Sequence, residues 1–71
     1  SNRKSTMSEI ITEEIPDSLA GERLDRIVSL MAEISRADAT TTIAAGAVEL
    51  DGVVAPTGKV RLKVGQILLM L

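Results

Sequence analysis

Two arginines stand at the starts of apolar-patterned segments, where their side chains could bind a negatively charged ligand. Arg23 lies in the run Gly-Glu-Arg-Leu-Asp of residues 21–25, and Ser35-Arg36 opens a second such segment. Guanidinium groups form charge-assisted hydrogen bonds to phosphate, and the free backbone N–H groups at a helix start also bind anions. Three alternating cations further along offer the same chemistry: Lys59, Arg61 and Lys63. These six residues predict a binding surface and no catalytic site.

The composition excludes several kinds of site. The chain of 71 residues contains no cysteine and no histidine. Disulfides, the usual zinc ligand sets, the commonest general base and a nucleophilic thiol are therefore all missing. We expect a single domain with no metal, no cofactor and no small-molecule substrate.

Charge and hydrophobicity restrict the partners further. The net charge is −2, but four basic against seven acidic residues lie in 1–34, and four basic against three acidic lie in 35–71. No aromatic residue is present, so bases of a nucleic acid cannot stack on aromatic side chains. The longest apolar run, Ile67–Leu71, is far shorter than the roughly 20 residues that span a membrane. These features predict a soluble cytoplasmic protein whose nucleic-acid contacts, if any, use backbone shape and charge.

The first elements follow from breaks in the pattern. Residues 1–7 are polar and without periodicity, and we interpret them as a disordered lead or an expression-vector remnant ahead of a starting Met7. Residues 8–71 would then form the domain. Ser8–Ile15 predicts a short edge strand that stops at Pro16, because proline cannot donate to a sheet.

A first helix is predicted from Glu22 to about Glu33. Leu24, Ile27, Val28 and Met31 have the spacing of one helical stripe. The stripe is widened by Leu30 and Ile34, and Arg23 lies at its margin. The opposite, solvent-facing arc is expected to hold five polar residues: Glu22, Asp25, Arg26, Ser29 and Glu33.

A second helix is predicted to start near Arg36. Ser35 fits an N-cap, with Asp38 reaching back as in a capping box. The three β-branched residues of 40–42 weaken its helix propensity, and Gly46 provides a stop.

The remaining residues favour short strands. Residues 47–50 and 53–55 flank Asp51-Gly52, the dipeptide typical of a two-residue type I′ hairpin. In residues 59–64 apolar and basic side chains alternate, which predicts a strand with three cations on one face. A turn at Val64-Gly65 then leads into Gln66–Leu71. The elements together indicate an α+β fold.

The ordered set of these pieces resembles a known family. Arg-Leu-Asp, then Ser-Arg, then Val-x-Leu-Asp-Gly, then Val-x-Leu-x-Val-Gly-Gln-Ile is similar to the S4 RNA-binding domain, or αL motif, over residues 21–67. With a lead-in strand at Glu9–Ile15, the chain most resembles the amino-terminal S4 domain of the large-subunit ribosomal RNA pseudouridine synthases. Each piece is weak evidence alone, and the matching order and spacing carry the resemblance.

The resemblance implies two helices packed on a small, mostly antiparallel sheet, with structured RNA lying across the second helix and the adjoining hairpin. It implies RNA-facing roles for Arg23, Ser35 and Arg36, and a separate catalytic domain following in the parent protein. Lys59, Arg61 and Lys63 are added here from the strand alternation alone. The chain itself is expected to be inactive, and its Arg23-Leu24-Asp25 only coincidentally resembles the catalytic motif of the much larger synthase domain.

Three alternatives stay open. The family usually has basic or amide residues where this chain has Asp38, Thr40 and Thr41, and asparagine where it has Asp51, so the fold could serve protein interaction or structure instead. The parent could also be another S4-bearing protein, such as a tyrosyl-tRNA synthetase or a ribosome rescue factor.

The third alternative is that the basic side chains stabilise the fold and do not contact RNA. Arg23 and Arg26 would then pair with neighbouring acids, Arg36 with Asp38 or a nearby glutamate, and the cations of 59–63 would keep a sheet edge soluble.

Overall fold

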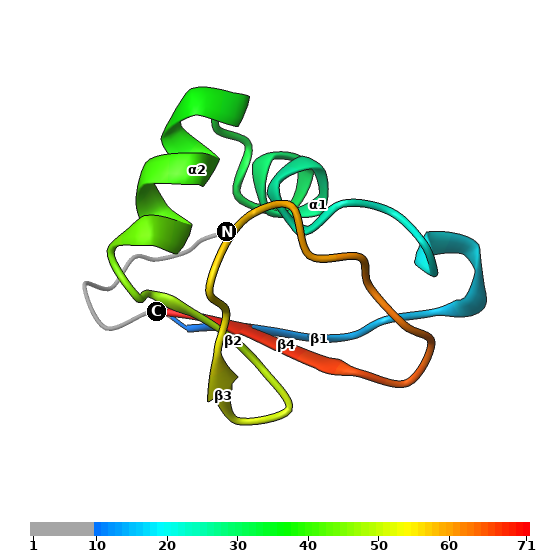
Figure 1. Ribbon diagram of the computed structural model, residues 1–71. Helices are drawn as coiled ribbons and strands as arrows, with labels where there is room; N and C mark the ends of the chain where they lie inside the picture. Colours follow the sequence, from blue (N-terminus) through cyan, green and yellow to red (C-terminus); the bar gives the residue numbers. More distant parts are fainter. Residues whose placement is uncertain (1–9) are drawn as a thin grey trace.

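Two helices cover one face of a four-stranded sheet (Figure 1). The computed structural model describes residues 10–71, so the expected disordered lead at 1–7 and the expected start of the first strand lie outside the described residues. The elements in chain order are β1 (Ile11–Glu14), the short 3-10 helix η1 (Asp17–Leu19), α1 (Leu24–Ala32), α2 (Arg36–Ala44), β2 (Val48–Leu50), β3 (Val53–Val54) and β4 (Ile67–Met70). The predicted α+β class is confirmed.

The sheet order is β1-β4-β2-β3, and every neighbouring pair is antiparallel. The strand from the end of the sequence, β4, therefore lies inside the sheet, where Met70 pairs with Ile11 of β1 on one side and with Val48 of β2 on the other. β1 is an edge strand, as predicted, and Ile15 beyond it is buried.

The turn between β2 and β3 has the predicted hairpin geometry. Leu50 pairs with Val53, so that Asp51 and Gly52 alone form the loop, and both have positive φ angles, 51° and 81°. Positive φ at both central residues defines the type I′ turn, whose twist matches that of the flanking strands. The Asp51 side chain also accepts a hydrogen bond from the Ile67 N–H (2.9 Å), which ties the turn to β4.

The first helix is shorter than predicted, and its buried face is differently placed. α1 begins after Arg23, which is its N-cap residue, and Glu33 ends it in a left-handed conformation (φ 57°). The expected polar arc is wrong at Asp25 and Ser29, which are both buried, and Leu30, expected on the apolar stripe, is 61% exposed. At Asp25 the reason is that the loop at Gly58 passes directly over the first turn of α1 and covers this side chain.

The second helix begins as predicted, with the Ser35 hydroxyl accepting a hydrogen bond from the Asp38 N–H (3.0 Å). The Ser35 cap is confirmed; among the hydrogen bonds of residues 10–71, the reciprocal bond from the Asp38 side chain is not found. The three threonine hydroxyls donate to the carbonyls one turn earlier, at 2.9 to 3.1 Å, so their polar groups are satisfied on the helix itself. This accommodates a β-branched run on an exposed helix surface.

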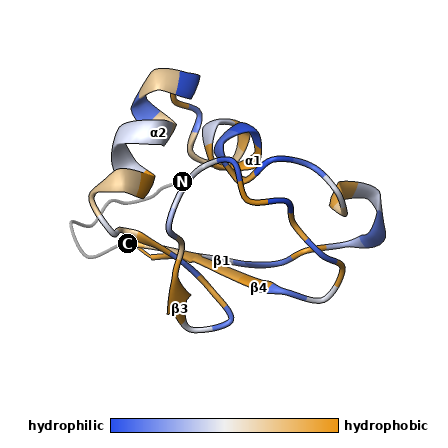
Figure 2. Cartoon of the chain, in the orientation of Figure 1, coloured by the Kyte–Doolittle hydropathy of each residue, from blue (hydrophilic) through white to orange (hydrophobic). Residues whose placement is uncertain are grey.

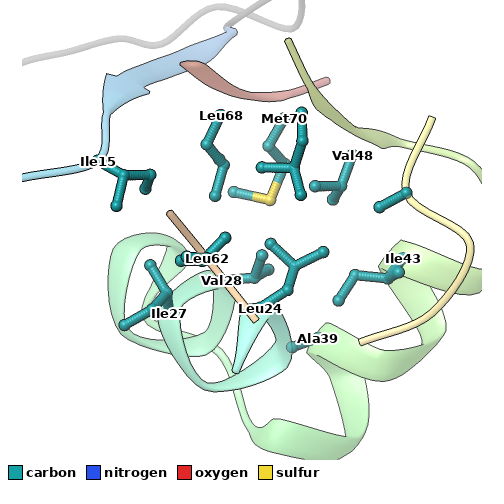
Figure 3. Close-up of a cluster of buried hydrophobic side chains, with 12 residues drawn as sticks. Ile15, Leu24, Ile27, Val28, Ala39, Ile43, Val48, Leu62, Leu68 and Met70 are labelled. Carbon is teal, nitrogen blue, oxygen red and sulfur yellow. The ribbon is translucent and has the colours of Figure 1, made fainter. Parts of the chain in front are cut away.

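The core lies between the helices and the inner face of the sheet (Figure 3). Leu68, Met70 and Val48 point from the sheet toward Leu24 and Val28 of α1, and α2 contributes its two buried residues. The complete buried hydrophobic set is Ile15, Leu24, Ile27, Val28, Ala39, Ile43, Val48, Leu50, Ala55, Leu62, Leu68 and Met70. Met31 packs against this core and Met70 belongs to it.

Residues 59–64 do not form the predicted strand. The segment makes one isolated antiparallel bridge, Arg23 with Arg61, and residues on both sides of it are turns or irregular. Its partner, residues 21–24, becomes helical at Leu24, so the ladder cannot extend. The alternation still holds in part, since Leu62 is buried, but Val64 is 60% exposed.

Candidate nucleic-acid interface

The buried carboxylate of Asp25 joins two of the predicted arginines. Its Oδ2 accepts a hydrogen bond from Nη2 of Arg23 at 2.7 Å, and its Oδ1 accepts one from Nη2 of Arg36 at 3.0 Å. Asp25 lies in the first turn of α1, Arg23 caps that helix, and Arg36 is the first residue of α2. One carboxylate therefore brings guanidinium groups from the starts of two helices together.

Arg61 is brought to the same place by the backbone. In its bridge with Arg23, the Leu24 N–H donates to the Val60 carbonyl (2.8 Å) and the Leu62 N–H donates to the Glu22 carbonyl (2.9 Å). This is the non-hydrogen-bonded type of antiparallel pair, in which opposite side chains lie on the same face and are closest together. Arg61 is further held by a hydrogen bond from its Nη1 to the Gly21 carbonyl (3.0 Å). Arg23, Arg36 and Arg61 with Asp25 are called the arginine cluster below.

The cluster keeps Asp25 ionised. Burial is the largest single influence on this carboxyl and raises its pKa. The hydrogen bond and charge of Arg23, the charge of Arg36 and a backbone hydrogen bond from Arg26 together outweigh burial, so that the pKa of Asp25 is lowered below its ordinary value. Asp25 neutralises one of the two guanidinium groups that contact it, and Arg61 lies opposite Arg23 in the bridge, so the three arginines exceed the one carboxylate in charge.

The hydrogen bonds to Asp25 engage only some of the N–H donors of Arg23 and Arg36. The side chains of Arg23 and Arg36 are 38% and 53% exposed, whereas that of Asp25 is 6% exposed. A guanidinium has five N–H donors in a planar fork that matches phosphate oxygens. The Nε of Arg23 is buried and has no hydrogen-bond partner among residues 10–71, so it does not face solvent. Because the two side chains are partly exposed, the cluster retains other guanidinium donors for an anion at the surface.

The start of α1 is closed to an anion. The N–H groups of Leu24 and Asp25, which would be free at a helix start, donate to the carbonyls of Val60 and Gly58 at 2.8 and 3.0 Å. Gly58 is required for this approach, since a Cβ at position 58 would lie 2.7 Å from the Cβ of Asp25. At this helix the guanidinium of Arg23 is therefore available, and these two backbone donors are not.

The start of α2 is also partly occupied. The Ser35 hydroxyl is engaged as the cap of the Asp38 N–H, so its structural role is confirmed and its predicted RNA contact is untested. The Asp38 carboxylate lies in the same first turn. Its negative charge interacts favourably with the helix dipole, and it repels a phosphate. Arg36 is the group at this helix start that reaches the cluster.

The two predicted lysines make no ion pair with the arginine cluster. Lys59 and Lys63 are exposed, and within the part of the chain described here neither side chain belongs to an ion pair. Lys59 follows Gly58 in the loop over α1, and the backbone of Lys63 is held by the Gln66 side chain (2.8 Å). Of the six predicted residues, the structure brings three together, with Ser35 adjacent in sequence to one of them.

The ion pairs expected as structural alternatives are found in part. Arg26 pairs with Glu22 one helical turn away at 3.7 Å, and both side chains are well exposed. Arg36 pairs with Asp25 rather than with Asp38 or a glutamate. Sequence reasoning missed the roles of Asp25 and Gly58. The closeness of Asp25 to Arg23 was a usable signal, whereas nothing local marks Gly58 as its neighbour.

In residues 10–71, no group of three or more acidic side chains could hold a metal ion, and no pocket is found. None of the helices in this part of the chain has the length and apolarity needed to cross a membrane. The surface cluster of arginines is therefore the candidate site to explain.

A comparison of the sequence with protein-family models and with curated proteins found no match.

Proposed function

We propose that this chain is an S4-like RNA-binding module that docks structured RNA, in the first instance ribosomal RNA, through the arginine cluster. We further propose that it serves as the amino-terminal domain of a cytoplasmic pseudouridine synthase, whose catalytic step is performed by a separate domain. The module would then hold the RNA and leave the choice of the reacting base to that domain.

One observation carries the proposal: a single buried carboxylate orients guanidinium groups from α1 and α2, while more than a third of each arginine side chain remains exposed. Fixed guanidinium groups lose less conformational freedom when they bind a phosphate than freely rotating ones do. Arg61 adds a third guanidinium group, on the same face of the bridge as Arg23. Such a cluster matches neighbouring phosphates of a folded RNA better than a single anion.

The surface of α2 supports close approach of a backbone. Its exposed residues beyond Arg36 and Asp38 are small and uncharged, among them Ala37, Thr40 and Thr41. The threonine hydroxyls are uncharged and donate their hydrogen bonds to their own helix, so they neither repel a phosphate nor select a particular base. The absence of aromatic residues excludes stacking of bases on aromatic rings, so recognition would depend mainly on RNA shape and charge.

The test is a salt titration. Fluorescence anisotropy with labelled ribosomal RNA hairpins should give a log affinity that falls with log salt, by about 0.7 to 0.9 for each phosphate contact. Three contacts predict a slope between about −2 and −3, and Arg61→Gln should make it shallower by about one contact. Affinity that is independent of salt, or a slope unchanged by Arg61→Gln, would remove the cluster from the interface.

A second candidate function is favoured by the same ion pairs. If pairing with Asp25 already satisfies Arg23 and Arg36, the cluster would only lock the two helix starts together, and the fold would serve as a structural or protein-interaction domain. In that case, no binding to ribosomal RNA hairpins is expected even at low salt. Binding of transfer RNA should be measured in parallel. A preference for transfer RNA over the ribosomal RNA hairpins would favour a parent such as a tyrosyl-tRNA synthetase or a rescue factor.

A further inference from the structure

The face of the sheet that points away from the helices carries an exposed apolar row. In β4, Leu68 and Met70 are buried in the core, so Ile67 and Leu69 point to the opposite side. Ile67 is 40% exposed and Leu69 is half-buried. No helix of the described chain covers this side (Figure 1), and β3 and β4 consist of hydrophobic residues (Figure 2).

Carboxylates flank this row on both sides. Glu14 of β1 pairs directly with Ile67, and Glu49 of β2 pairs directly with Leu69, so each shares the outer face with its partner. Glu49 also pairs with Val54 of β3, which is 50% exposed and extends the apolar surface. Ile67, Leu69 and Val54 with Glu14 and Glu49 are called the outer face below.

The charge on this side is of one sign. The four strands contain no lysine or arginine, whereas every cation of residues 10–71 lies on the helices, at a helix start or in the 59–63 loop. The helix layer thus carries charges of both signs, with these cations beside Glu22, Asp25, Glu33 and Asp38, whereas the only charged residues of the strands are the carboxylates Glu13, Glu14 and Glu49. A partner of the outer face must offer apolar side chains in a row with cations on either side.

We propose that the outer face binds a basic amphipathic helix of a partner protein. One face of such a helix presents an apolar stripe, and the long stems of flanking Lys and Arg residues can reach past it to carboxylates on both sides. Alternate residues of β4 are about 6.6 Å apart, close to the roughly 6 Å between helical residues i and i+4, so successive anchors can match.

Other occupants fit less well. A second copy of the chain would place four carboxylates, Glu14 and Glu49 from each copy, in one interface and would offer them no cation from its own strands. An anionic membrane surface would be repelled by the same carboxylates. The proposal does not depend on RNA binding, because the outer face and the arginine cluster share no residue.

The test uses the whole chain and three synthetic peptides of 18 residues. The first has leucines at helical i, i+3, i+4 and i+7 positions flanked by lysines, the second has glutamates in place of the lysines, and the third is a scrambled form of the first. We expect the first to bind at least 10-fold more tightly than the other two. Amide chemical shifts should move on β4, β2 and β1, and not at Arg36.

Two pairs of variants make the test specific. Ile67→Thr with Leu69→Thr should weaken binding of the lysine peptide at least 10-fold. Glu14→Lys with Glu49→Lys should reverse the preference toward the glutamate peptide. Glu22→Lys with Glu33→Lys, at the two ends of α1, makes the same change in net charge and should alter binding less than two-fold. Circular dichroism of each variant confirms folding, and the charge variants keep the test decisive if the threonine pair does not fold.

Several results would overturn the proposal. Equal binding of the scrambled peptide would show that charge alone is responsible. Concentration-dependent dimerisation that is lost in the threonine pair would assign the outer face to a second copy, and vesicle binding lost in that pair would assign it to lipid. Unchanged peptide binding in both pairs of outer-face variants would place the peptide elsewhere.

Discussion

Nη2 of Arg36, the first residue of α2, lies 3.0 Å from the Asp25 carboxylate in the first turn of α1. The two residues are eleven positions apart in the sequence, so this contact joins two separate helices. It fixes the start of one helix to the start of the other at the surface where the arginine cluster is exposed. The stability of the fold and the affinity of the proposed site therefore share one ion pair, and the two effects can be separated experimentally.

The first prediction concerns affinity. Arg36→Ala should weaken binding to ribosomal RNA hairpins by about 10- to 150-fold, since a hydrogen bond to a charged group contributes about 1.5 to 3 kcal/mol. Arg26→Ala is the matched control, because Arg26 lies on α1 and pairs with exposed Glu22 outside the cluster. It should change affinity less than two-fold in the same anisotropy assay at low salt. Equal losses in both variants would indicate a general charge effect.

The second prediction concerns stability. Asp25→Ala removes the acceptor of two charge-assisted hydrogen bonds and should lower the free energy of unfolding by about 1.5 to 3 kcal/mol. The loss is below that of a fully buried pair because Arg23 and Arg36 remain solvated. Urea denaturation should show a lower midpoint with an unchanged slope. A midpoint equal to that of the unaltered chain would mean that the ion pairs add nothing.

The third prediction concerns pH. The pKa of Asp25 is lowered in the folded protein from an ordinary value of 3.8, so the unfolded chain binds more protons between these two values and stability rises with pH there. The contribution of Asp25 is complete above pH 3.8 and is lost as the pH falls through the folded-state pKa. The stability difference between the unaltered chain and Asp25→Asn should therefore be constant from about pH 5 to 8 and shrink below about pH 4. A difference that persists unchanged into strong acid would contradict this assignment.

The fourth prediction concerns Gly58. Gly58→Ala places a Cβ 2.7 Å from the Cβ of Asp25, an atom next to the helix backbone that cannot rotate away. The loop must shift, and we expect a loss of about 1 to 3 kcal/mol, as for overpacking in a core. Neighbouring Thr57→Ala serves as the control, since Thr57 is exposed and accepts only a long hydrogen bond of 3.3 Å from the Lys59 N–H. Thermal unfolding should separate the two variants, and equal midpoints would argue against the close contact.

Features that depend on a few neighbouring residues could be predicted from the sequence. The Ser35 cap and the Asp51-Gly52 turn were predicted at the correct residues, because their geometry is determined by the side chain and backbone preferences of two to four adjacent positions. The apolar spacing of Leu24, Ile27 and Val28 likewise predicted the buried side of α1.

Features that depend on contacts between distant segments could not be predicted from the sequence. Periodicity placed Asp25 on the solvent side, but the loop at Gly58 covers it, and nothing near Asp25 in the sequence indicates that loop. The alternation at 59–64 predicted a strand, yet its pairing partner turns into α1 after a single bridge. Arg23 and Arg36 were predicted as site residues, whereas the carboxylate that joins them was assigned to the solvent-facing arc.

The position of β4 has a consequence for the order in which the protein can assemble during translation. The N-terminal strand β1 finds its partner only in β4, with Ile11 opposite Met70, whereas α1 with α2 and β2 with β3 need only nearby residues. Leu68 and Met70 of β4 also belong to the hydrophobic core, so neither the sheet nor the core on which the helices pack can be completed before residues 67–70 are synthesised. In a nascent chain, the sheet would be completed when residues 67–70 leave the ribosomal exit tunnel and pair with β1 on one side and β2 on the other.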